Sequence, residues 1–234
     1  MFTYKNRTSR QMGLKVAKDV MLSSPARAVE SVAVDGRDGT LTLDRGRYDN
    51  VDWNIPVILL NNEDIEQRLT DITDWLLTDV RFHDFLWDSD PDFVYRAMCH
   101  QQYNVQRLLR TVGKTIINFK MHQIKYLHTA LTERAITNNT NVQNPYNIHA
   151  KPRFRILGGG HITIGVRNTQ LVLRGIAGGC IVDSESQTIT SLDGRITLFD
   201  RMYSSFPVLQ PGNNVITFPN NIQVFITPRL GALV

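Results

Sequence analysis

The sequence predicts a mainly β protein with one helix, a fold class between all-β and α+β. One stretch, residues 61–78, carries an apolar stripe at helical period, whereas other apolar residues mostly alternate with polar ones as in half-buried strands. After residue 147, short strand patterns and turn signals follow one another at the spacing typical of a β-sandwich. We therefore expect a sheet-based chain in which one helix covers a sheet face.

The predicted helix begins near Asn61 or Asn62, either of which can cap it. The acidic Glu63 and Asp64 suit the positive end of the helix dipole. Its apolar residues are spaced by four, three and four positions and form one face, which Trp75 widens: Ile65, Leu69, Ile72 and Leu76. Core packing against a sheet accounts for all of these features.

Composition places the chain among globular proteins. Of its 234 residues, 42% are hydrophobic and 21% are charged, which suits one large β domain or two smaller ones. No apolar run approaches the roughly 18 residues of a membrane span, and residues 1–13 lack the apolar core of a signal peptide. We therefore expect no membrane insertion and a protein kept in a cytosol until something releases it.

Charge is distributed in two blocks, although the net charge is only +4. Residues 63–92 hold ten acidic residues against Arg68 and Arg81, whereas residues 96–125 hold basic residues and no acidic ones. Two solvated faces would explain this. The alternative is self-complementarity, with subunits set head to tail in a ring. The sequence has no stripe of basic residues interleaved with aromatic ones, so we expect no sequence-specific nucleic-acid binding.

A hairpin is predicted early in the chain. Residues 28–34 and 40–43 alternate, and the intervening residues 35–39 supply two glycines that can adopt positive φ. Calcium at Asp35 and Asp38 is a weaker alternative, because the alternating oxygen ligands and the terminal Glu of a known calcium loop are missing. This loop either contacts a neighbouring molecule or merely closes the hairpin.

A polar segment rich in Thr and Asn predicts the domain boundary. We place an N-terminal domain at residues 1–135, a linker at 136–149 and a C-terminal β-sandwich at 150–234. Within the first domain, Pro56 suggests a strand edge or a break. Within the second, residues 158–160 predict a tight hairpin turn and residues 196–198 a short strand.

No catalytic, metal or cofactor motif is present. The histidines are scattered, and Cys99 and Cys180 follow no ligand spacing, so we expect reduced, half-buried thiols. Asp183 and Glu185 share one strand face and could form a glycosidase pair, but such enzymes hold their carboxylates on opposite sides of a sugar. We expect a structural role at a turn, and predict no enzyme activity and no cofactor.

Several short motifs, weak singly, occur in an order and spacing that resemble the distal tail proteins (Dit family) of siphophages infecting Gram-positive bacteria. The resemblance covers nearly the whole chain. It rests on residues 36–39, 74–76, 88–91 followed by Tyr95, 150–156, 158–160, 181–185, 206–216 and 224–229.

This resemblance implies an N-terminal β-sandwich with a helix, six copies of which form a hub ring, and a C-terminal galectin-like β-sandwich. The implied partners are other copies of the chain, the tail tube protein and the tail-associated tip protein, with receptor-binding or baseplate proteins at the periphery. The implied location is the virion tail tip, after assembly in the host cytoplasm. DNA would pass through the channel without being read.

The main alternative is a carbohydrate-binding module that recognises a host-wall saccharide. All three tryptophans precede the linker, so a stacking platform would have to use Tyr146, Tyr203 or a phenylalanine. For the hub, the candidate interface residues are Gly36, Arg37, Asp38, Gly39, Asp71, Asp74, Arg107, Arg110 and Lys114.

Overall fold

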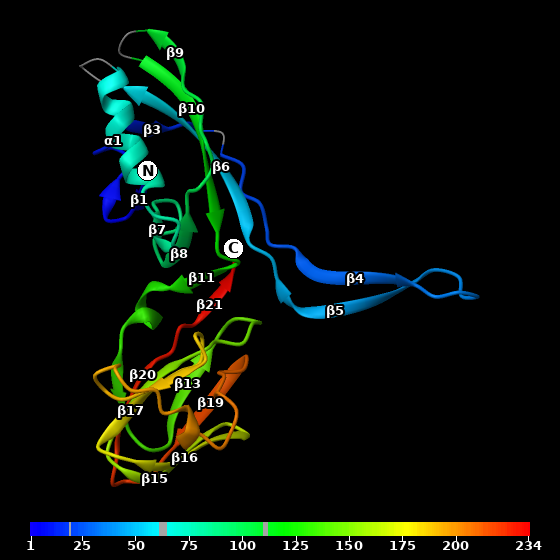
Figure 1. Ribbon diagram of the computed structural model, residues 1–234, viewed down its shortest axis with the longest axis vertical. Helices are drawn as coiled ribbons and strands as arrows, with labels where there is room; N and C mark the ends of the chain where they lie inside the picture. The colour runs from blue at the N-terminus through cyan, green and yellow to red at the C-terminus, as the bar shows by residue number, and fades with distance from the viewer. Residues whose placement is uncertain (19, 61–64, 110–111) are drawn as a thin grey trace. The chain divides into compact units, whose positions relative to one another are not determined.

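The computed structural model describes residues 1–18, 20–60, 65–109 and 112–234 (Figure 1). The chain divides into two compact units. The first holds Met1–Lys125 with Leu233–Val234, and the second holds Tyr126–Ala232. Most described residues lie in β-strands, and α1 (Ile65–Leu77) is the one α-helix among them. The predicted fold class, mainly β with one helix, is confirmed.

The first unit is built on one curled, ten-stranded sheet, of which residues 126–127 and 231–232 count with the second unit. Its main path runs β2-β1-β7-β8-β10-β6-β3, while β9 pairs with β10, β11 pairs with β8, and β21 pairs with β11. The strands are β1 (Phe2–Tyr4), β2 (Arg7–Thr8), β3 (Leu14–Val16), β6 (Val51–Leu60), β7 (His83–Trp87), β8 (Phe93–Met98), β9 (Gln106–Leu109), β10 (Val112–Met121), β11 (Ile124–Leu127) and β21 (Gly231–Leu233).

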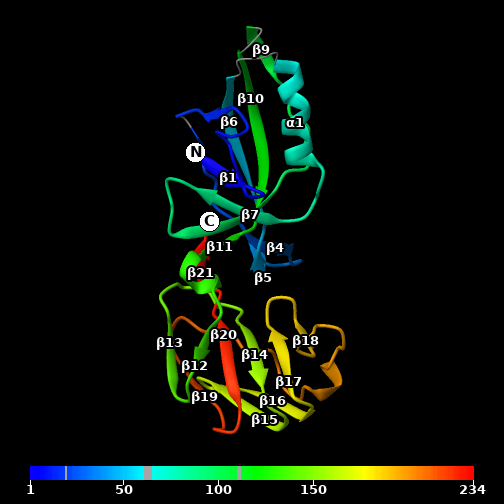
Figure 2. The same ribbon diagram turned by 90° about the vertical axis from the view of Figure 1, so that its left-hand side faces the viewer.

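Helix α1 packs on the inner face of this sheet, beside β10 in both ribbon views (Figures 1 and 2). Ile72, Trp75 and Leu76 are buried in a core to which strands from both ends of the sheet contribute. The Trp75 indole N–H donates to the carbonyl of Tyr4 at 2.9 Å, which fixes the helix to β1. The predicted packing role is confirmed, whereas the predicted cap, Asn61 or Asn62, and the acidic Glu63 and Asp64 lie outside the described residues.

Pro56 lies within β6, which continues through it without a break, and it stands where the pairing with β3 ends, so the expected edge is present on that side only. It is opposite Ile116 of β10, and its carbonyl accepts the N–H of Ala17 at 2.9 Å on the β3 side. Because the N and C=O of one strand residue point to the same side, the missing donor of Pro56 also faces that side. The pairing of β3 ends at Val16, so no ladder hydrogen bond is lost there.

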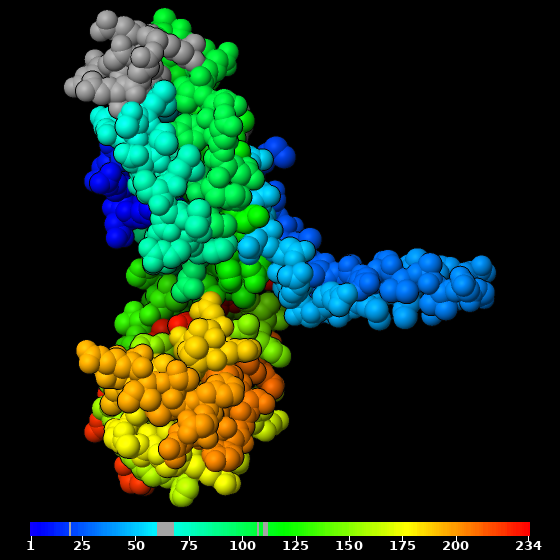
Figure 3. Space-filling model, viewed as in Figure 1, coloured from blue at the N-terminus to red at the C-terminus, as the bar shows by residue number. Residues whose placement is uncertain are grey.

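The predicted hairpin is present as β4 (Arg27–Ala33) and β5 (Thr40–Tyr48), which pair antiparallel. Among the described strands they form a separate two-stranded sheet. We call residues 27–48 the arm. No arm residue is buried, and in Figure 3 the arm, in blue, is uncovered on the face toward the viewer.

The second unit is a sandwich of two antiparallel sheets around a separate core (Figure 2). The orders are β12-β20-β14-β17-β18 and β13-β19-β15-β16. The strands are β12 (Arg134–Ile136), β13 (Thr140–Asn144), β14 (Arg153–Leu157), β15 (Gly160–Val166), β16 (Thr169–Ile176), β17 (Gly179–Asp183), β18 (Thr188–Thr190), β19 (Gly212–Thr217) and β20 (Gln223–Thr227).

Residues 136–149, the predicted linker, contain β13, which pairs with β19 over five positions. The chain passes between the two compact units at Lys125 and Tyr126 instead. The Asn and Thr residues that suggested a linker hold this segment in place. Asn144 donates to the carbonyls of Ile148 and Leu209 at 2.8 and 3.2 Å.

Two local expectations in the second unit were wrong. Residues 158–160 do not close a hairpin, because β14 and β15 lie in different sheets and the glycines carry the chain between them. A Cβ on Gly159 would meet the Ile176 carbonyl oxygen at 2.8 Å, so the crossing requires glycine there. Residues 196–198 form only an isolated bridge from Thr197 to Thr190 before a 3₁₀ turn.

Cys99 and Cys180 are free thiols, each fully buried in the core of its own unit. Burial raises the pKa of Cys99 to about 11 and that of Cys180 to about 12. Both thiols therefore stay protonated at neutral pH and behave as small apolar side chains.

Candidate functional site

The four-residue loop 36–39, a predicted interface, is the exposed tip of the arm. Gly36 and Gly39 adopt φ of +78° and +82°, which favours glycine, and a Cβ on either would meet open space. The glycines are therefore explained by the turn itself. Arg37 and Asp38 lie between them and are exposed.

The arm has one apolar face. The register places Val32 opposite Leu41 and Glu30 opposite Leu43, so these four side chains share a face. Leu41 and Leu43 are 40% and 44% exposed. The other face carries mostly small and polar side chains, such as Ser31 opposite Thr42, together with the exposed Val29 opposite Asp44. A two-stranded ribbon is at best marginally stable in water by itself, so this apolar face is a surface suited to a partner.

Ion pairs at the base of the arm fix its register. Arg27 donates to the Asp44 carboxylate and, through Nη1, to the Tyr48 hydroxyl at 3.2 Å, and Arg45 pairs with Glu30. The hydrogen bond from Arg27 lowers the pKa of Asp44 below its usual range. These groups are exposed, and exposed pairs stabilise little, so they set the geometry of the arm rather than its stability.

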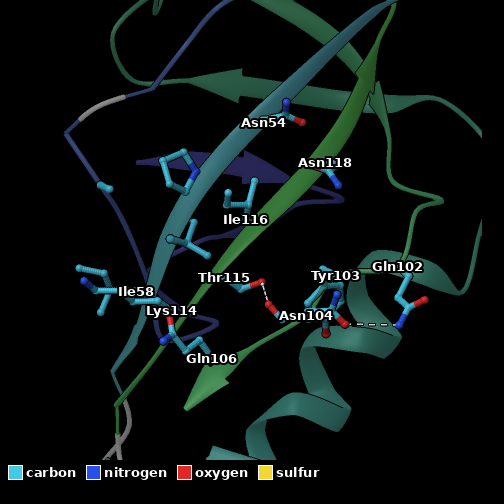
Figure 4. Close-up of a pocket in the computed structure, with 13 residues that line it drawn as sticks. Asn54, Ile58, Gln102, Tyr103, Asn104, Gln106, Lys114, Thr115, Ile116 and Asn118 are labelled. Atoms are coloured by element: carbon cyan, nitrogen blue, oxygen red, sulfur yellow. Dashed lines mark hydrogen bonds between the residues drawn. The ribbon is translucent and has the colours of Figure 1, made fainter. Parts of the chain in front are cut away.

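A second candidate surface, the outer groove, lies on the face of β6 and β10 that turns away from the core (Figure 4). Its volume is about 710 Å³. Its apolar floor is made by Pro56, Ile58 and Ile116, and polar groups surround it, including Asn54 and Asn118. Ile116 is 52% exposed, which is unusual for a central strand.

Lys114, a predicted interface residue, lines this groove, is exposed and makes no ion pair with another described residue. Arg107 lies on β9, where its backbone pairs with Gly113, so the two basic positions are on adjacent strands. Arg110 lies outside the described residues.

Asp71 and Asp74 are exposed on the outer face of α1. Asp71 lies 3.6 Å from Arg68, whereas Asp74 makes no ion pair within the described part of the chain. Along β10, Lys114 and Ile116 alternate with buried residues that share the core with α1. The acidic helix surface and the lysine-bearing outer groove therefore lie on opposite faces of the sheet.

The structure thus places the candidate residues that it describes on three separate surfaces: the tip of the arm, the outer face of α1 and the outer groove. Sequence reasoning missed the apolar side chains of two of them, Leu41 and Leu43 on the arm and Ile116 in the groove. Leu41 and Leu43 look like the buried positions of any alternating strand. In the groove a signal existed, because the adjacent apolar pairs Ile58-Leu59 and Ile116-Ile117 interrupt the alternation.

Asp183 and Glu185 are held by Arg229 in the second unit. The guanidinium donates to both oxygens of Asp183 at 2.6 and 2.8 Å and lies 3.2 Å from Glu185, which also accepts the Tyr126 hydroxyl at 2.6 Å. Burial acts to raise the pKa of Asp183, but the hydrogen bonds and charge of Arg229 outweigh it and lower the pKa. A carboxylate held ionised by a largely buried arginine is a poor general acid, which agrees with the predicted structural role.

No group of three or more His, Cys, Asp or Glu side chains in the described ranges is placed to hold a metal ion. None of the helices formed by those residues is long and apolar enough to cross a membrane.

Comparison with known proteins identifies a structural relative. No family model matches the sequence, and no curated protein matches it. Among solved structures, the chain is similar to SPP1 Dit (gp 19.1), described as a paradigm of the hub adsorption apparatus in phages infecting Gram-positive bacteria. The TM-score is 0.73 at 14% sequence identity, over 96% of each chain. This chain therefore has the fold of a phage Dit protein from end to end, as its sequence motifs indicated.

Proposed function

We propose that the protein is a structural hub of a phage tail, a homohexameric ring that connects the tail tube to the tail tip or baseplate. The observation that carries the proposal is the arm, whose apolar face is uncovered in a single copy. The Dit fold and the ordered sequence motifs support the same role.

The arm supplies the ring contact. Its apolar face packs on the neighbouring copy, and its unpaired strand edges offer backbone hydrogen bonds of the kind that proteins normally protect. Burying Leu41 and Leu43 would contribute about 1.5–3 kcal/mol each.

Charge favours a head-to-tail arrangement. A contact between unlike faces generates a ring when the rotation closes. Asp74 on α1 and Lys114 in the outer groove lie on opposite faces of one sheet and lack ionic partners among the described residues. In a head-to-tail ring, Asp74 of one copy would lie beside Lys114 of the next. Face-to-face dimers would instead bring like charges together, which disfavours them.

The remaining partners follow from this role. The ring contacts the last ring of the tail tube protein on one side and the tail-associated tip protein on the other, and its channel passes DNA during ejection. Receptor-binding or baseplate proteins dock at the periphery. The protein belongs to the virion and is assembled in the host cytoplasm.

The arm contact is tested by the double substitution Leu41→Ser with Leu43→Ser. We expect the wild type to have the mass of a hexamer or a multiple of it by light scattering, alone or with the tail tube protein. The variant should dissociate at a roughly 100-fold higher concentration, because about 3 kcal/mol of apolar burial is lost.

Thr40→Ser with Thr42→Ser, on the opposite face of the same strand, is the matched control and should assemble like the wild type. A wild type that stays monomeric with and without the tube protein would contradict the ring. If the Leu41→Ser, Leu43→Ser variant is still a hexamer, the ring proposal stands but the arm is not part of the ring interface.

The charge contact is tested by Asp71→Lys with Asp74→Lys. We expect the ring to weaken by about 0.5–2 kcal/mol in total and the wild-type ring to loosen as salt rises, because exposed charges are screened. Adding Lys114→Glu should restore part of the assembly. If the charge-reversed variant has the same assembled mass as the wild type at low salt, apolar contacts alone stabilise the ring.

A further inference from the structure

Two apolar surfaces of the first unit are uncovered in a single copy, the face of the arm and the floor of the outer groove. No arm residue is buried, and Ile116 on the groove floor is 52% exposed although β10 pairs with β6 along its whole length. Helix α1 and the core cover only the opposite face of the sheet. Neither surface covers the other, so each is free to take a partner from another molecule.

The floor of the outer groove is arranged in two rows that cross the strands. In the first row, Ile116 of β10 lies opposite Pro56 of β6. In the second row, Ile58 of β6 lies between Lys114 on β10 and Lys15 on β3, both of which are exposed. Residues opposite each other in a sheet share a face, so the floor is an apolar row beside a basic row.

One wall of the groove is held in place by hydrogen bonds (Figure 4). Tyr103 and Asn104 line this wall. The Asn104 carbonyl accepts the Thr115 hydroxyl at 2.8 Å, and the hydroxyls of Tyr103 and Thr73 share a hydrogen bond of 2.7 Å. These bonds fix the segment before β9 to the sheet and to α1, so the groove is preformed. A preformed surface binds a partner without the entropy cost of ordering itself.

The arm matches this floor in shape. Val32, Leu41 and Leu43 form an apolar patch on a ribbon of two strands, and the floor is likewise a pair of strands, β6 and β10. A ribbon can lie on such a pair as a second layer, because sheets pack face to face about 10 Å apart with their side chains between them. The contact buries apolar surface on both partners, which favours association.

The charges match as well. The tip of the arm, residues 35–38, holds two aspartates and one arginine, which are exposed and make no ion pair with another described residue. Lys15 also makes none within the described part of the chain. From Leu41 to Asp38 the chain spans at most about 10 Å, and from Ile116 to the basic row β10 spans about 7 Å. An arm that sets Leu41 on Ile116 therefore brings its acidic tip to the basic row.

We infer that the outer groove of one copy receives the arm of the next copy. Leu41 and Leu43 pack on Pro56 and Ile116, and the acidic tip lies beside Lys15, which leaves the other lysine of the basic row to the charge contact. The inference rests on the proposed ring and names the surface that the arm contacts in it. Each copy has one arm and one groove, so the contact joins unlike surfaces and repeats head to tail.

Chemical cross-linking of the double variant Leu41→Cys with Ile116→Cys tests this contact. A short bismaleimide, which joins only closely facing thiols, should link successive copies into a ladder up to the hexamer on denaturing gels. The native thiols of Cys99 and Cys180 are fully buried and stay protonated, so they do not react. Thr42→Cys with Ile116→Cys is the matched control and should give roughly tenfold less linked product, because residue 42 points away from the groove.

Assembly measurements test the same contact without a cross-linker. Ile116→Ser should raise the concentration at which the ring dissociates roughly tenfold, because an apolar side chain loses its burial. Added to the Leu41→Ser, Leu43→Ser variant, it should have little further effect, since the contact is already lost. Val80→Ser is the control and should assemble like the wild type, because Val80 is 69% exposed and lies outside the groove.

The outcomes separate this contact from the ring itself. If the wild type is assembled but the Leu41→Cys, Ile116→Cys variant gives no ladder, or no more than its control, the ring stands and the groove is not the acceptor. Linkage of Leu41→Cys alone into dimers and no further would show a contact between arms and overturn the proposal. A wild type that stays monomeric with and without the tube protein would contradict the ring and this contact with it.

Discussion

Replacing Phe85 by Ala should destabilise the first unit by about 4 kcal/mol, since truncating a fully buried phenylalanine costs about 3–5 kcal/mol. Phe85 is fully buried on β7. Its ring stacks on Phe2 and Trp87, with centroids 5.3 and 6.1 Å away, and meets Phe119 edge-on at 5.2 Å. The cavity would open between strands from separate parts of the sheet, where neighbours cannot collapse into it.

Urea unfolding followed by tryptophan fluorescence measures this loss. All three tryptophans belong to the first unit, and Trp53 and Trp87 lie against Phe85, so the signal reports on that unit alone. Phe82→Ala is the control, because Phe82 is 36% exposed. It should cost less than about 1 kcal/mol. If the two variants unfolded at the same urea concentration, the aromatic cluster would not be the centre of stability.

Replacing Arg229 by Met should destabilise the second unit by about 3 kcal/mol. The side chains of Arg229 and Asp183 are only 14% and 15% exposed, and their bidentate contact closes the cluster with Glu185. Removing one partner leaves two carboxylates close together and partly buried, which costs far more than the intact pair contributes. Methionine preserves the volume, and the Arg229 backbone N–H can still donate to Ala130.

Hydrogen exchange resolves the expected effect by unit. Amides of β14, β17 and β20 should lose protection, while those of β10 should keep theirs, because the two cores are separate. Arg195→Met is the control. Arg195 lies 3.9 Å from Asp193 with both side chains exposed, so that change should be nearly neutral.

The pH dependence gives a further check on the cluster. Arg229 keeps the pKa of Asp183 below its unfolded value of about 3.9 despite the opposing effect of burial. The wild-type contribution is therefore fully present above that pH and is lost as pH falls through the folded pKa. Without Arg229, burial dominates and raises the pKa of Asp183. The stability difference between variant and wild type should then shrink toward pH 4, and a constant difference would contradict this account.

The sequence by itself determined the elements whose signals are local. The helical stripe of Ile72 and Leu76 and the glycine turn at 36–39 each act within a few residues, and both are present. The order of short motifs carried the Dit resemblance, and these motifs lie in elements of several kinds, such as the turn at 36–39 and helix α1 at 74–76. Asp183 and Glu185 were placed correctly at a turn, but their partner Arg229 is more than forty residues away and no local pattern names it.

The tertiary structure decided which faces are covered. Leu41 on the arm and Ile117 in β10 both follow the alternation of a half-buried strand, yet Leu41 is exposed and Ile117 is fully buried. Alternation specifies that a strand has an apolar face, but only the packing of distant strands specifies what lies against it. For the same reason Pro56 was tolerated inside a sheet, and the polar residues 136–149 became an ordered strand and turn. Their hydrogen-bond partners come from elsewhere in the chain, and only the fold brings those partners within reach.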